Sequence, residues 1–151
     1  MRLDFHTHGK LAKKLPFSTA YTDWLFGEAR RAGLDALCLT EHFNTLQFDE
    51  LYRHLSSVSR REEDVLELEN GLRVFPGMET DVAEGGHILS IGPLEAILEL
   101  NHRLEPHKEK GPVSYTHLDV YKRQAFISVC DQKLTVIFRK QSLFPKIYGS
   151  D

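Results

Sequence analysis

Residues 34–42 read LDALCLTEH, and this stretch decides the fold. Leu34 to Leu39 form an almost continuous apolar run, which is typical of a strand buried on both faces of a parallel sheet. The run ends at Thr40-Glu41-His42, so polar side chains that can bind a metal follow directly after a buried strand. This stretch therefore predicts both a central strand and a site at its carboxyl end.

Strand and helix patterns alternate before this run. Residues 2–6 alternate polar and apolar side chains, as a short strand does. Ser18 or Thr19 can cap a helix, and Gly33 stands where a left-handed residue ends one. The apolar positions of this amphipathic helix follow a period of about 3.6 residues. They are Tyr21, Trp24, Leu25, Ala29 and Ala32.

The same alternation continues after the run. We predict a helix over about 48–58, a strand from 72 to 76 that leads into Gly77-Met78-Glu79, a strand at 87–91, and a helix from Pro93 to about Arg103. Residues 60–64 are ambiguous between helix and loop, and 65–69 cannot be assigned. The alternation predicts an α/β fold with parallel strands, either an open sheet or the first part of a barrel.

Composition narrows the function. A chain of 151 residues with 41% hydrophobic content fits one ordinary globular domain, and its net charge of −3 makes a nucleic-acid partner improbable. No apolar run approaches the roughly 20 residues that cross a bilayer, and the start lacks a secretory signal, so we expect a cytoplasmic protein with no membrane partner. Two cysteines, Cys38 and Cys130, are too few for a thiolate site, so any metal must be bound by His and carboxylates.

Residues 112–124, PVSYTHLDVYKRQ, interrupt the chain. They resemble the translation of a transposase sequencing-adaptor end joined to its own reverse complement, with Asp119 to Gln124 encoded by the forward copy. A natural polar loop is the alternative. We therefore divide the chain into residues 1–111, an adaptor-derived segment at 112–124, and an unrelated tail at 125–151, which has strand-like runs such as 134–138 but no motif. Residues 1–111 alone carry 13 Lys and Arg against 19 Asp and Glu, a charge of −6.

Candidate metal ligands stand at the ends of successive predicted strands. His6 and His8 are two residues apart on an extended backbone and so share a face, where they can bind one cation. Asp4 could accept the distal N–H of a ligating His. His42 ends the second predicted strand and Glu79 the third. Because chemistry collects at the carboxyl edge of parallel sheets, we expect these side chains to share one site.

The motifs DFHTH, LTEHFN, PGMETDV and GHILSIG, in this order, resemble those of the PHP (polymerase and histidinol phosphatase) family over about residues 1–100. The resemblance implies a distorted (β/α) barrel, here incomplete with its first three or four βα units, that binds two or three divalent ions (Zn, Mn or Fe) and hydrolyses phosphate esters. His6 and His8 would bind one metal, Glu79 would bridge two, and His42 would serve a further one. His87 resembles a ligand in some members; the alternative is a buried histidine satisfied by backbone groups.

The chain departs from the family at two places. Glu41 replaces a common Asp before the family's His and is expected to support the ligands from behind. Lys14 stands where many members have another His, so the resemblance does not supply a complete third site. Lys10, Lys13 and Lys14 are weak candidates for contacts with substrate phosphate, since loop lysines are often only solvated.

The resemblance implies a metal-dependent phosphatase of a small phosphate ester, similar to histidinol phosphatases. Later family motifs would lie beyond this chain, so we expect an incomplete ligand set, weak metal binding and little activity. The alternatives are an amidohydrolase-type barrel metallohydrolase and a non-catalytic metal-binding module. The remaining histidines have no partner motif and are expected at the surface, except His117, which falls in the adaptor-like segment. They are His54, His102 and His107.

Overall fold

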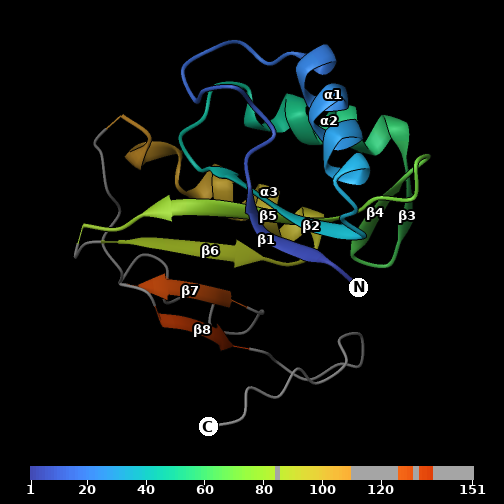
Figure 1. Ribbon diagram of the computed structural model, residues 1–151. Coiled ribbons are helices and arrows are strands. Elements are labelled where there is room, and N and C mark those ends of the chain that lie inside the picture. The colour runs from blue at the N-terminus through green and yellow to red at the C-terminus, as the bar shows by residue number, and fades with distance from the viewer. Residues whose placement is uncertain (84–85, 110–125, 131–132, 138–151) are drawn as a thin grey trace, which may run out of the picture.

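The computed structural model describes residues 1–83, 86–109, 126–130 and 133–137. These residues form a mixed α/β fold built on one sheet (Figure 1). Its elements follow in chain order as β1 (Leu3–Thr7), α1 (Thr19–Arg31), β2 (Ala36–His42), α2 (Phe48–Val58), β3 (Ser59–Glu62), β4 (Val65–Leu68), β5 (Arg73–Asp81), β6 (His87–Ile91), α3 (Leu94–Arg103), a 3-10 turn η1 (Glu105–His107), β7 (Phe126–Cys130) and β8 (Lys133–Ile137).

The sheet has the strand order β1-β2-β5-β6-β7-β8, and the β3–β4 hairpin joins it through β4, which pairs with β5. Strands β1, β2 and β5 are parallel, as the sequence predicts. Strand β6 is antiparallel to β5, which corrects the expectation of a further parallel unit. The reason is the connection: residues 82–86 are too few for the crossover of a dozen or more residues that parallel strands need, so the chain turns back as a hairpin.

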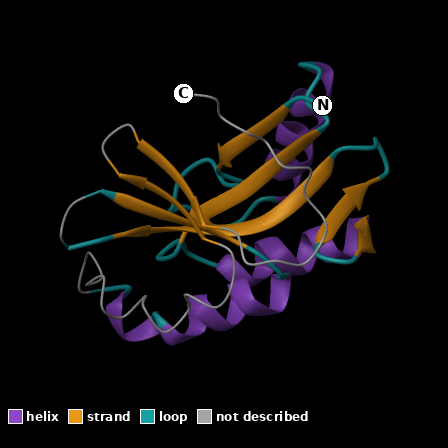
Figure 2. Ribbon diagram, turned by 90° about the horizontal axis from the view of Figure 1, so that it is seen from below, coloured by secondary structure: helices purple, strands orange, loops and turns teal. Residues whose placement is uncertain are grey.

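The sheet stays open in the described part of the chain, because β1 and β8 end the strand order and do not pair with each other. Seen from below, the strands form one twisted layer (Figure 2). Residues of α1, α2 and α3 pack in one apolar cluster with Leu37 and Leu39 of β2. A partial barrel of the predicted type is compatible with this open sheet.

Helix α1 begins as the sequence predicts and buries a different face. The Ser18 hydroxyl accepts a hydrogen bond from the Tyr21 N–H, and Gly33 has the positive φ of 84° that ends the helix. The buried residues of the helix are Thr22 and Phe26, whereas the predicted core residue Trp24 is 54% exposed. Thr22 is buried because its hydroxyl donates to the Gly9 carbonyl, at a distance of 2.8 Å.

No helix in the described ranges is long and apolar enough to span a membrane.

The core lies where β2 and β5 meet α2 and α3. Residues Ala36 to Leu39 are buried in β2, and Leu37 and Leu39 share one apolar cluster with Leu51 of α2 and Ile97 of α3. Each such side chain contributes about 1.5–3 kcal/mol when it is removed from water. This packing fixes the two central strands, and with them the residues at their carboxyl ends.

Tyr52 of α2 joins the two central strands inside this core. Its hydroxyl oxygen lies 2.9 Å from the Leu39 carbonyl and 2.6 Å from the Gly77 carbonyl, and it accepts a hydrogen bond from the Gly77 N–H at 2.9 Å. Burial raises the pKa of the Tyr52 hydroxyl far above its usual value, so it stays protonated. Gly77 admits no side chain, because a Cβ atom there would lie 2.7 Å from the Ser90 carbonyl oxygen.

The structure describes only part of the carboxyl-terminal region to which the predictions for residues 112–151 refer. Residues 112–124 lie outside the described residues. The predicted strand-like run at 134–138 overlaps β8, and β7 pairs antiparallel with β6, with His87 opposite Val129. The division of the chain at residues 111 and 124 stays a prediction.

Candidate metal centre

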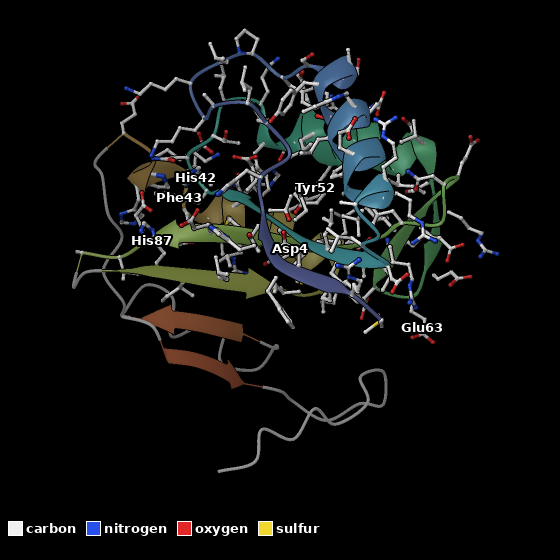
Figure 3. The ribbon with its side chains drawn as sticks, viewed as in Figure 1. Asp4, His42, Phe43, Tyr52, Glu63 and His87 are labelled. Atoms are coloured by element: carbon white, nitrogen blue, oxygen red, sulfur yellow. The ribbon has the colours of Figure 1, made fainter. Side chains whose placement is uncertain are left out.

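The predicted ligands come together at one edge of the sheet. β1 ends at Thr7, directly before His8, and β2 ends at His42, which is paired in register with Glu79 of β5. Strand β6 begins at the same edge because it is antiparallel, and its first residue, His87, lies opposite Asp81. Figure 3 shows His42 and His87 at this end of the sheet and Glu63 at the opposite end.

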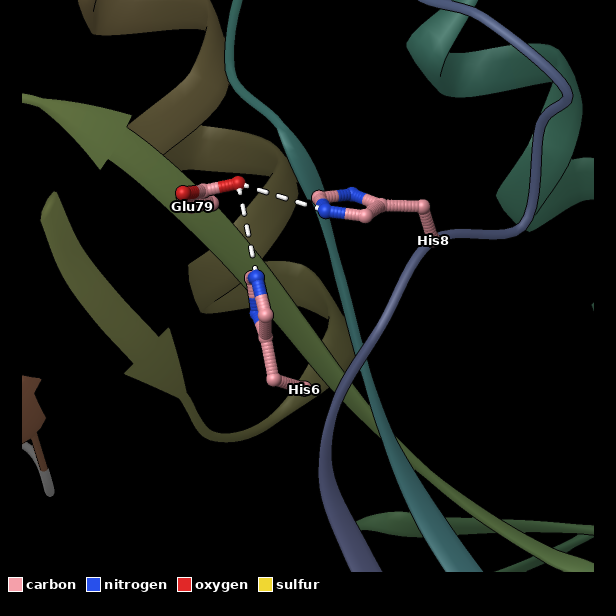
Figure 4. A group of neighbouring side chains, drawn as sticks. All are labelled: His6, His8 and Glu79. Atoms are coloured by element: carbon pink, nitrogen blue, oxygen red, sulfur yellow. Dashed lines mark ion pairs between the residues drawn. The ribbon is translucent and has the colours of Figure 1, made fainter.

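Glu79 is the centre of the cluster. Its side chain is only 5% exposed, and its Oε2 atom lies 3.1 Å from His42 Nδ1 and 3.4 Å from His8 Nε2. His6 Nε2 lies 3.9 Å from the same oxygen, so His6 and His8 approach it from two directions (Figure 4). The predicted ligands of β1, β2 and β5 therefore surround one buried carboxylate.

His87 and Asp81 extend the cluster from β6 and from the end of β5. His87 Nδ1 lies 3.0 Å from Glu79 Oε1 and 2.7 Å from Asp81 Oδ1. His87 is 56% exposed at its side chain, so the alternative of a buried histidine satisfied by backbone groups is wrong. Asp81 was not predicted as a site residue, although its position two residues after Glu79 places both carboxylates on one face of the strand.

Several polar atoms of the cluster are buried without a hydrogen bond. Glu79 Oε2, His42 Nδ1 and His8 Nδ1 have none in the described structure, and the 3.1 Å approach of Glu79 Oε2 to His42 Nδ1 lacks hydrogen-bond geometry. A buried polar atom left unpaired costs about 1–3 kcal/mol. Glu79 Oε2 and His42 Nδ1 face each other, which is an arrangement that a cation satisfies, whereas His8 Nδ1 lies toward Glu41. Two groups of residues have ligand atoms within 4.8 Å of one another. The groups are His6, His8 and Glu79, and His42, Glu79 and Asp81.

Asp4 does not play the predicted role. Its carboxylate accepts a hydrogen bond from the backbone N–H of His6 at 3.0 Å, rather than from an imidazole ring. The short Asp side chain reaches the backbone two residues ahead more readily than a ring. The partner of the His6 ring is Thr40, whose Oγ1 lies 2.8 Å from Nδ1. Thr40 thus orients His6 with its Nε2 toward Glu79.

Glu41 lies behind the cluster, and its predicted supporting role stays a prediction. It is 1% exposed, and its carboxylate accepts hydrogen bonds from the backbone N–H groups of Lys10 and His42, both at 3.1 Å. Its Oε1 also lies 3.9 Å from His8 Nδ1. One buried carboxylate therefore joins the loop after β1 to the end of β2 and holds His8 and His42 near each other.

The three lysines lie in different environments. Lys10 is 5% exposed and its ammonium donates to the Leu46 carbonyl, so the prediction that it meets substrate phosphate is wrong. Burial lowers the pKa of the Lys10 ammonium. Lys13 Nζ lies 4.0 Å from Asp81 Oδ2, at the rim of the cluster, and Lys14 is exposed. Only Lys13 is therefore close to the candidate metal ligands.

The imidazoles are packed against one another. The rings of His8 and His42 are stacked with centroids 4.4 Å apart, and His6 meets His8 edge-on at 4.8 Å. Burial lowers the pKa of His8, and the nearby His42 lowers it further, against the opposing effect of Glu79. A lowered pKa favours the neutral imidazole, which is the form that binds metal.

The other histidines lie away from the cluster. His54 Nε2 lies 2.7 Å from Asp23 Oδ1 and joins α2 to α1, whereas His102 Nε2 lies 2.8 Å from Asp49 Oδ2 and joins α3 to α2. His102 is exposed as predicted, but the His54 side chain is only 14% exposed because it packs against Phe17. His117 lies outside the described residues.

Comparisons with known proteins bear on the fold. No family model matches the chain, and no curated protein matches it. Two solved structures are similar. PsfC from Pseudomonas syringae PB-5123 has 23% identity over 87% of this chain, with a TM-score of 0.59. The lesion-specific endonuclease PfuEndoQ from Pyrococcus furiosus has 20% identity over 69% of this chain, with a TM-score of 0.52.

At these levels of identity the comparisons show the fold alone. They support a mixed α/β arrangement that is compatible with a PHP-type fold. The match spans 60% of the PsfC chain and 25% of the endonuclease chain, so this chain corresponds to only part of each. A structural neighbour is a nuclease, and His, Glu and Asp side chains that can bind a metal lie together in this chain.

Proposed function

We propose that residues 1–111 are the amino-terminal part of a PHP-type phosphoesterase that hydrolyses a small phosphate ester, in the manner of a histidinol phosphatase. One observation carries the proposal: His6, His8 and His42 surround a buried Glu79 oxygen that has no hydrogen bond in the described structure. An ordinary core avoids a buried carboxylate oxygen without a hydrogen bond, because leaving a buried polar atom unsatisfied is costly.

The residues present fit a divalent cation. Imidazole nitrogens and carboxylate oxygens suit Zn, Mn and Fe, and Glu79 belongs to both groups of residues that could hold an ion. When bound, such an ion supplies Lewis-acid polarisation of a phosphoryl oxygen and lowers the pKa of a water molecule. The predicted number of two or three ions remains part of the proposal.

The chain's own residues prepare this site. Glu79 supplies the negative charge at its centre, and Thr40 and Glu41 hold His6, His8 and the end of β2 in place. Lys13 at the rim offers a positive charge to a substrate phosphate, as a point charge rather than as a bidentate group. Each residue thus has a role in binding or orientation.

The choice of a phosphate ester has two supports. One structural neighbour is described as a lesion-specific endonuclease, and an endonuclease acts on a phosphate diester. The charge of −6 on residues 1–111 opposes the broad cationic surface that grips a nucleic-acid backbone, so a small substrate is favoured over DNA or RNA. We propose a small phosphorylated molecule as the partner and the cytoplasm as the location.

Hydrolysis that depends on Glu79 tests the proposal. The full chain is loaded with Zn²⁺ or Mn²⁺ and assayed with p-nitrophenyl phosphate, bis-p-nitrophenyl phosphate and a p-nitroanilide amide. We expect slow hydrolysis of the monoester above the free-metal background, lost in Glu79→Gln and retained in the matched surface variant Glu69→Gln.

The alternatives give different results in this assay. Hydrolysis of the amide alone would indicate an amidohydrolase-type enzyme. Metal bound at the cluster without any hydrolysis that depends on Glu79 would indicate a non-catalytic metal-binding module. Either result would overturn the phosphoesterase proposal.

A further inference from the structure

We infer that Asp81, together with His42 and Glu79, forms a second cation position whose ligands are harder than those of the position formed by His6, His8 and Glu79. The inference rests on the metal centre of the proposed function and deepens it, because it assigns unlike metal preferences to two positions that share Glu79. Asp81 is absent from the ligands that the sequence predicts.

The backbone places Asp81 for this role. Glu79 and Asp81 are two residues apart near the end of β5, so their side chains leave the same face of the strand. His42 is in register with Glu79 on the neighbouring strand β2. Ligand atoms of His42, Glu79 and Asp81 lie within 4.8 Å of one another, as do those of His6, His8 and Glu79.

The shared ligand is built for two neighbours. The Glu79 side chain is 95% buried, and its Oε2 atom has no hydrogen bond although His42 Nδ1 lies only 3.1 Å away. His42 Nδ1 is also buried without a hydrogen bond. Glu79 Oε2 also lies 3.4 Å from His8 Nε2, so Glu79 contacts His8 as well as His42. His42 and Asp81 belong to the second group of ligands, which shares Glu79 with the first. Each position therefore includes a buried ligand atom that has no hydrogen bond: Glu79 Oε2 in both positions, and His42 Nδ1 in the second.

The two ligand sets differ in chemical hardness. The His6 position offers two imidazoles and one carboxylate, a set that suits Zn²⁺. The Asp81 position offers one imidazole and two carboxylates, and carboxylate oxygens suit Mn²⁺ or Mg²⁺. We assign Zn²⁺ to the first position and Mn²⁺ to the second.

Two groups already contact Asp81. His87 Nδ1 lies 2.7 Å from Oδ1 and orients the carboxylate, while Lys13 Nζ lies 4.0 Å from Oδ2. The Lys13 pair is half-exposed, and such pairs contribute little, about 0–1 kcal/mol. A cation can therefore replace Lys13 at Asp81 Oδ2 at small cost, while His87 continues to hold Oδ1.

A sequential titration tests the assignment. The metal-free full chain receives one equivalent of Zn²⁺ and is then titrated with Mn²⁺, and free Mn²⁺ is counted by electron paramagnetic resonance. We expect one bound Mn²⁺ per chain in the wild type. Asp81→Asn weakens Mn²⁺ binding at least about tenfold and leaves Zn²⁺ affinity unchanged, whereas His8→Ala weakens Zn²⁺ at least about tenfold.

Controls separate folding from binding. Asp64→Asn, an exposed carboxylate away from the cluster, retains both affinities, and Asp81→Glu retains a carboxylate and so retains Mn²⁺ binding. Circular dichroism confirms that each variant is folded. If Asp81→Asn does not fold, the wild type and Asp81→Glu still decide the result.

Each failure has a distinct signature. A wild type that binds Zn²⁺ but no Mn²⁺, or an Asp81→Asn variant with undiminished Mn²⁺ affinity, overturns this inference and leaves the proposed phosphoesterase site intact. A wild type that binds neither ion overturns both.

Discussion

Two charged regions of this molecule are arranged in opposite ways. At the outer end of the sheet, Arg61 of β3 forms two hydrogen bonds with Glu95 of α3, one of them 2.8 Å long, and both side chains are about half exposed. The Arg61 guanidinium lowers the pKa of Glu95 to about 2. At the metal centre, the buried Glu79 has an oxygen without any hydrogen bond in the described structure.

The difference separates stability from function. Charges that serve the fold are paired and solvated, as Arg61 and Glu95 are, and their loss has small effects. A carboxylate kept buried and incompletely paired lowers stability unless something else binds it. We therefore propose that Glu79 is retained for a ligand, and variants of the two regions should behave in opposite ways.

The largest expected effect is on metal affinity in Glu79→Gln. The substitution keeps the shape and removes the charge, so Zn²⁺ affinity should fall by more than about 100-fold, beyond the loss typical of residues behind the ligands. The free energy of unfolding of the metal-free variant should not fall, because a buried, incompletely paired charge is gone. Calorimetric titration and urea unfolding measure the two quantities. A metal-free variant much less stable than the wild type would show that Glu79 serves the fold.

Tyr52→Phe should change stability and leave the metal centre almost unaffected. It removes the hydroxyl that joins Leu39 and Gly77, and leaves buried backbone groups unpaired, so the unfolding free energy should fall by about 1–3 kcal/mol. Urea unfolding measures the loss, with the half-buried Tyr21→Phe as the matched control. A loss as small as that of the control would mean that the hydroxyl does not join the strands.

The stability of the metal-free chain should depend on pH through His8. Burial lowers the folded pKa of His8 below the unfolded value of 6.5, so the unfolded state binds more protons between the two values. The contribution of His8 is fully present above pH 6.5 and is lost as the pH falls through the lowered pKa. Unfolding measured from pH 8 to pH 5 should show this slope, and His8→Gln should flatten it. An unchanged slope in His8→Gln would assign the effect to another group.

The smallest expected effect is that of Arg61→Ala. Because the pair with Glu95 is exposed and screened, the unfolding free energy should fall by less than about 1 kcal/mol. Zn²⁺ affinity should stay within about twofold, since the pair lies outside the cluster. Thermal unfolding and calorimetric titration check both statements. A loss of Zn²⁺ affinity here would contradict the separation of the two regions.

The parallel core could be predicted from the sequence because burial leaves a clear pattern. Leu34 to Leu39 is apolar on both faces, and helix α2 has the predicted bounds of Phe48 and Val58. The β3–β4 hairpin was not predicted, because charged residues at 60–64 carry no apolar period. The predicted direction of β6 was wrong because periodicity identifies a strand but does not say whether it runs parallel or antiparallel to its neighbour.

At the candidate site, too, some features could be predicted from the sequence and others could not. The convergence of His42 and Glu79 follows from parallel strands that end in register, which the sequence indicates. The hydrogen-bond partner of the His6 ring could not be predicted, because the Thr40 contact depends on how β1 and β2 are aligned. Lys10 was assigned to the substrate because a loop lysine is usually exposed, whereas tertiary packing buries this one. The signal for Asp81 was present in its two-residue spacing from Glu79.

X-ray absorption at the zinc edge tests the central claim most directly. On the Zn²⁺-loaded full chain, the spectrum should show imidazole nitrogens and carboxylate oxygen at about 2.0–2.2 Å, and the imidazole contribution should fall in a variant that carries both His6→Ala and His8→Ala. A spectrum with water oxygens alone, or one that the double variant leaves unchanged, would contradict a metal centre formed by these strand ends.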